Sequence, residues 1–215
     1  MLQIESVSMK YGRQTVLENI SLQVPDGQCV SLIGESGSGK TTLISLLSAL
    51  DKVQSGSIKF NGKSIKKIGE GKFRLSYVNI VFQSYNLIKY MTARENVQIA
   101  LDFENISGNR KEKSYELLKR VGLGHAEADR LVNKLSGGQQ QRVAIARAMA
   151  GDTPIVVADE PTGNLDERTE AKILELFHAL AESGKIVIIV THSQKVAKHA
   201  KAIVYHMQDG LLKKK

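Results

Sequence analysis

The sequence has few of the residues that mark several protein classes. Of its 215 residues none is tryptophan, three are proline and one, Cys29, is cysteine. A single cysteine excludes an intrachain disulfide and suits a reducing compartment, and its position in an apolar run favours simple core packing. No apolar run reaches the roughly 18 residues that a membrane-spanning helix needs, and residues 1–5 lack the pattern of a signal peptide. We therefore expect a chain that is soluble on its own.

The net charge of the chain does not by itself identify a binding partner. The net charge is +8 and the sequence pI is about 9.5, which suits an anionic nucleotide, a nucleic acid or an anionic membrane surface. The basic residues are spread along the chain, with small clusters at 66–67, 111–113 and 213–215, so an ordinary solvated surface is the simplest interpretation. With 42% hydrophobic residues, the chain is expected to form one globular domain over residues 1–215.

The first third of the chain is typical of β-structure around one buried helix. Residues 2–7 and 20–24 alternate between apolar and polar, and residues 28–33 form an apolar run. Residues 42–50 are apolar on nearly all sides, as a buried helix would be. Two further strands are expected at 57–60 and 77–82.

The rest of the chain first becomes helical and then alternates. Residues 84–135 carry helix signals, which include a Thr92/Glu95 capping box, a helix at 111–121 and a loop at 107–109, and they predict an inserted helical lobe. Beyond it, helices and strands alternate, which favours an α/β fold with a mostly parallel sheet covered by helices. The segments expected are helices at 138–150 and 167–181 and strands at 155–159 and 185–190.

A glycine-rich loop follows the apolar run at 28–33. Residues 34–41 match G-x-x-x-x-G-K-[ST], in which glycines let backbone N–H groups curve around phosphate oxygens. Lys40 would reach the β- and γ-phosphates, and the Thr41 hydroxyl would bind Mg²⁺. The loop predicts ATP and Mg²⁺ as ligands, although alone it would equally fit a kinase, a GTPase or a motor. The predicted phosphate-binding residues are Gly34, Ser36, Gly37, Ser38, Gly39, Lys40, Thr41 and Thr42.

Two carboxylates end the apolar run at 155–159. Because parallel strands deliver their carboxyl ends to the ligand edge of an α/β sheet, Asp159 would hold Mg²⁺ through water. Glu160 is then placed to act as general base on the attacking water. Two solvated acids at a strand end are the alternative, which the neighbouring phosphate loop disfavours.

A second motif, Leu135-Ser136-Gly137-Gly138-Gln139, opens a predicted helix. Ser136 and Gln139 can form a capping box, and the exposed N–H groups of the two glycines can also hold an anion. The motif resembles the signature of the ABC-type ATPases, and it stands about 95 residues after Lys40, the separation seen in transporter ATP-binding subunits.

The resemblance extends to single residues elsewhere. Tyr11 is similar to the aromatic residue that stacks on adenine, and Gln83 to the glutamine that contacts Mg²⁺ and the attacking water. Asp166 resembles the D-loop aspartate and can also cap the next helix. His192 is similar to the switch histidine that contacts the γ-phosphate; the other four histidines lack a motif and suit surface or packing roles.

Within the family, residues 81–87 and 160–166 resemble the branch of macrolide exporters, lipoprotein-release ATPases and antimicrobial-peptide exporters. Glu35 and Asn79 depart from it, since proline and glycine are usual there. The resemblance implies a P-loop NTPase core with an N-terminal antiparallel β subdomain and the inserted lobe at 84–135.

The same resemblance implies a mechanism. Two chains would join head to tail, each signature at Ser136 closing over the other chain's nucleotide. Hydrolysis through Glu160, His192 and Gln83 would then power a separate membrane permease from the cytoplasmic face, and we expect export of a peptide, lipoprotein or drug.

Two other functions fit parts of the sequence. One is mechanotransmission to a membrane-bound sensor or hydrolase without solute transport. The other is a nucleic-acid-directed ATPase, but such proteins carry long coiled-coil insertions or tandem ATPase units that are not present here, so no nucleic-acid partner is expected.

Overall fold

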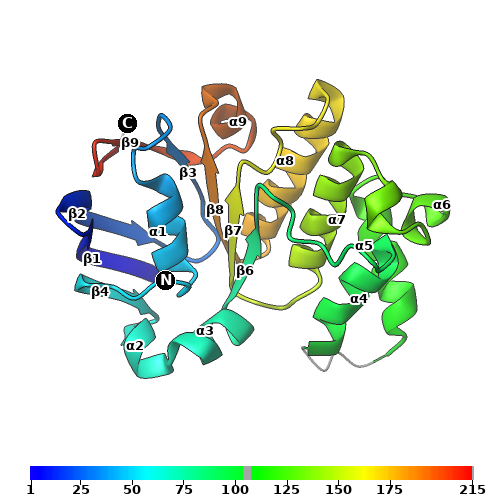
Figure 1. Cartoon of the computed structure of the whole chain (residues 1–215), viewed down its shortest axis with the longest axis horizontal. Helices are drawn as coiled ribbons and strands as arrows, with labels where there is room; N and C mark the ends of the chain where they lie inside the picture. Colours follow the sequence, from blue (N-terminus) through cyan, green and yellow to red (C-terminus); the bar gives the residue numbers. More distant parts are fainter. Residues whose placement is uncertain (104–107, 215) are drawn as a thin grey trace. The chain divides into compact units, whose positions relative to one another are not determined.

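The computed structural model describes residues 1–103 and 108–214, and it divides into two compact units (Figure 1). The first unit comprises Met1–Ile80, Thr153–Glu160 and the chain from Leu174 onward. The second comprises Val81–Asp152 and Pro161–Ile173. Each unit is described by itself.

An antiparallel sheet in the first unit uses the N-terminal strands. Its order is β2-β1-β4-β5, and its strands are β1 (Leu2–Tyr11), β2 (Gln14–Val24), β4 (Ser55–Phe60) and β5 (Lys63–Ser64). Leu2 faces Val24 on one side and Phe60 on the other, so the alternating apolar residues share one buried face. The antiparallel N-terminal subdomain is therefore confirmed.

The second sheet is mostly parallel and is built of short, continuously apolar strands. Its order is β10-β9-β3-β8-β7-β6. β3 lies parallel between β8 and β9, β7 is parallel to β8, and β9 and β10 are antiparallel. The strands are β3 (Cys29–Ile33), β6 (Val78–Val81), β7 (Ile155–Asp159), β8 (Ile186–Thr191), β9 (Ile203–Gln208) and β10 (Leu211–Lys214).

The pairing register of the parallel strands determines where the segments that follow them lie. Ile33 at the end of β3 pairs with Thr191 at the end of β8, and Asp159 at the end of β7 pairs with Val190. The chain segments that follow β3, β7 and β8 therefore emerge side by side at one edge.

Helix α1 (Lys40–Leu47) joins the two sheets into one core (Figure 1). Its buried Leu43, Ile44, Leu46 and Leu47 belong to a hydrophobic cluster that also contains residues of both sheets. This agrees with the apolar character expected at 42–50. Further helices are α2 (Ile65–Ile68), α3 (Glu70–Ser76), α8 (Glu167–Glu182), which begins in the second unit, and α9 (Gln194–His199).

The second unit is helical and larger than the lobe predicted at 84–135. Helix α7 packs on α4 and α5, so the compact unit also includes the helix that the sequence pattern assigned to the sheet. Asn109 caps α5 as its side chain accepts a hydrogen bond from the Glu112 amide at 3.2 Å, whereas the predicted loop position Ser107 lies outside the described residues. The elements are α4 (Ala93–Phe103), α5 (Arg110–Arg120), α6 (His125–Ala128), η1 (Val132–Lys134) and α7 (Gly137–Met149).

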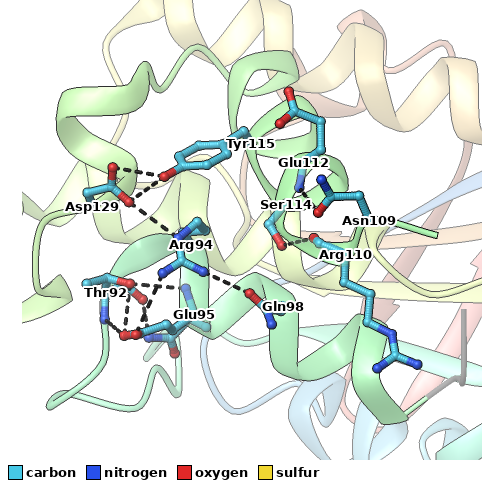
Figure 2. Close-up of polar contacts among 11 residues, drawn as sticks. Thr92, Arg94, Glu95, Gln98, Asn109, Arg110, Glu112, Ser114, Tyr115 and Asp129 are labelled. Atoms are coloured by element: carbon cyan, nitrogen blue, oxygen red, sulfur yellow. Dashed lines mark hydrogen bonds and ion pairs between the residues drawn. The ribbon is translucent and has the colours of Figure 1, made fainter. Parts of the chain in front are cut away.

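Polar contacts fasten the start of α4 (Figure 2). The Thr92 amide donates to Glu95 Oε2 at 2.8 Å and the Glu95 amide donates to Thr92 Oγ1 at 3.1 Å, which confirms the predicted capping box. Arg94 Nε donates to Asp129 at 3.3 Å, and the Tyr115 hydroxyl donates to the same carboxylate at 2.7 Å. Helices α4 and α5 are thereby joined to the segment after α6.

No helix in the described part of the chain combines the length and apolarity required to cross a bilayer.

Asn96 on α4 is a buried polar residue on which the preceding segment depends. The residue is 1% exposed, and its side chain accepts from the Ile88 amide at 2.8 Å and donates to the carbonyls of Ile88 and Thr92 at 3.1 and 3.0 Å. Asn96→Ala leaves buried backbone groups without partners and should lower the free energy of unfolding by about 2–3 kcal/mol. Urea denaturation measures this, with Gln98→Ala, which removes one hydrogen bond to Arg94, as the control expected within about 0.5 kcal/mol. Equal losses in both variants would contradict it.

Candidate functional site

The glycine-rich loop lies between the end of β3 and the start of α1, wrapped around the Lys40 ammonium. Lys40 Nζ donates to the carbonyl oxygens of Gly34 and Glu35 at 2.7 and 2.6 Å and approaches Ser38 Oγ at 3.4 Å. The side chain therefore holds the loop in a closed curve and presents its charge on the loop's concave side.

Two glycines of the loop are required by close packing. A Cβ on Gly34 would lie 2.3 Å from the Met207 carbonyl oxygen, and one on Gly39, whose φ is +101°, would lie 2.7 Å from the Val16 carbonyl oxygen. Gly37 differs, because its φ is +82° but a Cβ there would meet nothing within 4 Å. The loop is thus backed by β2 and β9 and is open at Gly37.

This open side borders a cavity of about 370 Å³. The cavity is lined by residues 34–38 of the loop and by residues 206–209, where β9 turns into β10. The Gly210 amide donates to the Ser38 carbonyl at 3.3 Å, so the turn supports the loop. Backbone N–H groups and the adjacent α1 N-terminus make this region suitable for phosphate oxygens.

Glu160, directly after β7, is held in one orientation. Its Oε1 accepts from the His192 amide at 2.9 Å and lies 2.8 Å from His192 Nδ1, and its Oε2 accepts from Thr191 Oγ1 at 3.0 Å. The Glu160 side chain is 16% exposed, whereas that of His192 is 76% exposed. The carboxylate is therefore fixed between the ends of β7 and β8, and the imidazole extends from it toward solvent.

Thr191 is a part of this arrangement that the sequence interpretation missed. Its hydroxyl also accepts from the Ser193 amide at 3.1 Å, so it orients Glu160 and the turn that carries His192 together. The available signal was a β-branched hydroxyl residue directly before His192.

Asp159 is the second acid at this edge, and its environment opposes its charge. Burial raises the pKa of Asp159, the charge of Glu160 raises it further, and the Lys40 ammonium partly opposes both effects. The loop lysine and both acids therefore lie within electrostatic reach of one another.

The oxygen donors available suit Mg²⁺ more than a transition metal. In the described residues there is no group of three or more His, Cys, Asp or Glu side chains able to hold a metal ion. Mg²⁺ is usually held by one or two carboxylates and by substrate phosphates, so the Thr41 hydroxyl and the Asp159 carboxylate fit it.

Tyr11 at the end of β1 also lies in the first unit. The residue is 50% exposed, and its hydroxyl donates to Asp51 Oδ2 at 3.2 Å. Partial burial and this hydrogen bond raise the pKa of Tyr11, while a hydrogen bond with Thr42 acts in the opposite direction. Tyr11 is therefore connected to the first turn of α1 and remains half exposed to solvent.

The remaining predicted site residues lie in the second unit. Ser136 Oγ accepts from the Gln139 amide at 3.3 Å and Gln139 Oε1 accepts from the Ser136 amide at 2.9 Å, which is the capping box expected of α7. Asp166 accepts from the Thr169 hydroxyl at 2.7 Å and from the Thr169 amide at 3.0 Å, and these two hydrogen bonds lower the pKa of Asp166. Gln83 follows β6 and is exposed.

Asp159→Asn should stabilise the folded protein at neutral pH. A raised pKa means that the folded state holds the proton more tightly than the unfolded state, so the cost of the charge appears as pH rises through the pKa of Asp159. The neutral amide removes that cost, and we expect a gain of up to about 1 kcal/mol, since solvent screens part of the repulsion. Urea denaturation at pH 7 and at progressively lower pH measures the difference, which should shrink as pH falls.

Asp102→Asn is the matched control, because that exposed carboxylate pairs with Arg110 at 3.1 Å and gains nothing from neutralisation. A destabilised Asp159→Asn protein at pH 7 would contradict the electrostatic interpretation.

Comparison with known proteins gives the family. Residues 17–163 match the sequence family described as ABC transporter. The Bacillus subtilis protein YclH, an uncharacterized ABC transporter ATP-binding protein, is 44% identical over 202 residues, which cover 92% of this chain and 89% of YclH. The macrolide export ATP-binding/permease protein MacB of Chlorobium phaeobacteroides is 39% identical over 99% of this chain, which spans 33% of MacB.

A solved structure agrees with this. The ATP-binding cassette MJ0796, a protein of Methanocaldococcus jannaschii, has a dimeric structure in a post-hydrolysis state bound to ADP and Pi. It superposes with a TM-score of 0.90 at 35% sequence identity, covering 100% of this chain and 98% of that one. The chain belongs to the ABC transporter family, as an ATP-hydrolysing, ATP-binding protein with the α/β cassette fold.

Proposed function

We propose that this chain binds MgATP at residues 34–42, joins a second copy head to tail, and powers a separate membrane permease that exports a peptide, lipoprotein or drug. The observation that carries the proposal is the Glu160–His192 pair, fixed by Thr191 at the sheet edge from which the phosphate loop also emerges. A general base must be held in a defined orientation, as this mostly buried carboxylate at the edge of the sheet is.

The proposed binding roles follow from the contacts of the first unit. Backbone amides between Gly34 and Thr42 hold the phosphates, and Lys40 exchanges its loop carbonyls for phosphate oxygens. Tyr11 stacks its exposed ring on the base. Thr41 and Asp159 hold Mg²⁺, together with Gln83, and the ion supplies charge neutralisation for the transferred phosphoryl group.

In the proposed chemistry, Glu160 Oε1 or Oε2 takes a proton from the attacking water. The carboxylate is positioned for this because three donors, at His192 N, His192 Nδ1 and Thr191 Oγ1, fix both of its oxygens. His192 Nδ1–H donates to Glu160, and in the doubly protonated imidazolium the exposed Nε2–H would donate to the γ-phosphate. Gln83 orients the water.

The signature residues Ser136, Gly137, Gly138 and Gln139 complete the site of the second copy in this proposal, with Asp166 close to the same junction. The dimeric state of the MJ0796 structure bound to ADP and Pi supports it. ATP would then hold two copies together, and hydrolysis would release them.

Relatives support a membrane partner. The MacB proteins, by their name, combine ATP-binding and permease functions, and this chain matches a third of the length of one of them. We infer that the permease of this system is a separate chain and that the ATPase is peripheral on the cytoplasmic face. Mechanotransmission to a membrane-bound sensor or hydrolase is the second candidate, and it uses the same ATPase cycle.

Glu160→Gln should separate binding from turnover. The amide keeps the shape of the side chain but is a poor base, so turnover should fall by about 10²–10⁴-fold while ATP binding persists. ATP should then shift the variant to a dimer on gel filtration. Lys40→Ala is the contrasting variant, because it should lose ATP affinity and therefore stay monomeric with ATP. Near-normal turnover of Glu160→Gln would exclude Glu160 as the base.

A tagged copy of the chain, purified from detergent-solubilised membranes of its source, should bring an integral membrane protein with it. The control is the same purification from membranes that lack the tagged chain. Transport by the complex in reconstituted vesicles would then distinguish a transporter from a mechanotransmitter, which would instead activate its membrane partner. Recovery of no membrane protein, or an ATPase stimulated by DNA, would remove the support for a permease partner.

A further inference from the structure

The segment directly after Gln83 adopts an unusual backbone conformation. Tyr85 and Asn86 are consecutive non-glycine residues with φ of +62° and +47°. Side-chain-bearing residues rarely occupy this left-handed region, and a pair of them costs free energy unless surrounding contacts hold it. Within the segment, the Asn86 amide donates to the Ser84 carbonyl at 2.7 Å and Ser84 Oγ contacts Asn86 Oδ1 at 3.0 Å.

Arg147 near the end of α7 holds this pair from outside the segment. Its Nη1 donates to the Asn86 carbonyl at 2.6 Å and its Nη2 donates to the Tyr85 carbonyl at 2.9 Å. Burial lowers the pKa of Arg147, but an arginine remains charged under ordinary conditions. The two strained residues therefore direct both of their carbonyl oxygens at one guanidinium group, a geometry that a lysine cannot reproduce.

The Tyr85 side chain reaches the other end of the same helix. Its hydroxyl accepts a hydrogen bond from Asn164 Nδ2 at 2.7 Å, and it would lie 3.5 Å from a Cβ placed on Gly137 in the signature. The Asn164 amide in turn donates to Gln141 Oε1 of α7 at 3.3 Å. Tyr85, two residues after Gln83, and Asn164, two residues before Asp166, therefore both lie at the N-terminal part of α7.

We propose that Arg147 and Tyr85 are positioning residues for hydrolysis. Arg147 sets the conformation of the segment that carries Gln83, and the Tyr85–Asn164 hydrogen bond ties this segment to the residue two positions before Asp166 and to the signature. The inference rests on the proposed function of Gln83. Its consequence is that loss of either contact should disturb the orientation of Gln83 and slow hydrolysis more than it weakens ATP binding.

The first test uses Arg147→Lys and Arg147→Met, with Arg120→Lys and Arg120→Met at the exposed end of α5 as controls. Because both substitutions remove the paired hydrogen bonds from the Arg147 guanidinium to the Tyr85 and Asn86 carbonyls, amide hydrogen exchange should rise in residues 84–88 for both Arg147 variants. The ATP turnover number should fall about tenfold or more in Arg147→Met and less in Arg147→Lys, while the KM for ATP changes by less than about threefold. The Arg120 variants should match wild type in all three measurements.

The role of Arg147 would be overturned by unchanged exchange at 84–88, or by unchanged turnover in a protein whose Gln83→Ala variant is impaired. If Gln83→Ala itself retains full turnover, the proposed function of Gln83 fails. The effect of Arg147 on the conformation of residues 84–88 is then tested by hydrogen exchange alone. A loss of turnover accompanied by an equal rise in KM, or by global unfolding in both Arg147 variants, would indicate a purely structural residue and would also overturn it.

The second test is a double-mutant cycle of Tyr85→Phe and Asn164→Ala, with the exposed Tyr90→Phe as the matched control. If the hydrogen bond couples the two segments, each single variant should lower turnover about two- to fivefold and the double variant should be no slower than the slower single one. Strictly multiplicative effects, or no effect of Tyr85→Phe, would refute the coupling.

Discussion

The parallel register of β3, β8 and β7 is the constraint on which the site depends. Ile33 pairs with Thr191 and Asp159 with Val190, so the phosphate loop, His192 and Glu160 emerge from adjacent strands at one edge. The strands themselves are almost wholly buried and contain no charge before Asp159. Polar chemistry is confined to the edge because a carboxylate inside such a sheet would lack both water and partners.

The edge concentrates features that reduce stability. Asp159 is held next to Glu160 with a raised pKa, Glu160 has a φ of +44°, and Gly39 is fixed at a φ that other residues resist. The hydrophobic cluster of α1 and both sheets includes Val157 and Val190 from the strands that end at this edge, and its burial supplies the stability that offsets these costs. Unfavourable backbone and charge placement at a site, supported by a well-packed core, is a common arrangement in enzymes.

Sequence patterns predicted what depends on local periodicity. Strand β7 was predicted with its observed bounds because its apolar run ends at two acids, and the capping boxes at Thr92 and Ser136 have the expected bonds. Strand β9 was missed because it mixes tyrosine, histidine and glutamine and is only half-buried. The extent of the helical unit and the contact of Arg147 with Asn86 depend on tertiary packing between residues about 60 positions apart, which no local pattern encodes.

Capping and ligand binding can use the same residues because they use different atoms. Ser136 Oγ accepts from the Gln139 amide through a lone pair, so its hydroxyl proton stays available to donate to a phosphate oxygen. His192 is similar: its contact with Glu160 involves Nδ1, and Nε2 lies on an exposed side chain. The structural contacts therefore fix the orientation of each group and leave its second polar atom for the proposed contact with a nucleotide. On this argument the capping box at Ser136 favours the proposed anion site, since a serine held by its own helix is already oriented before the second copy arrives.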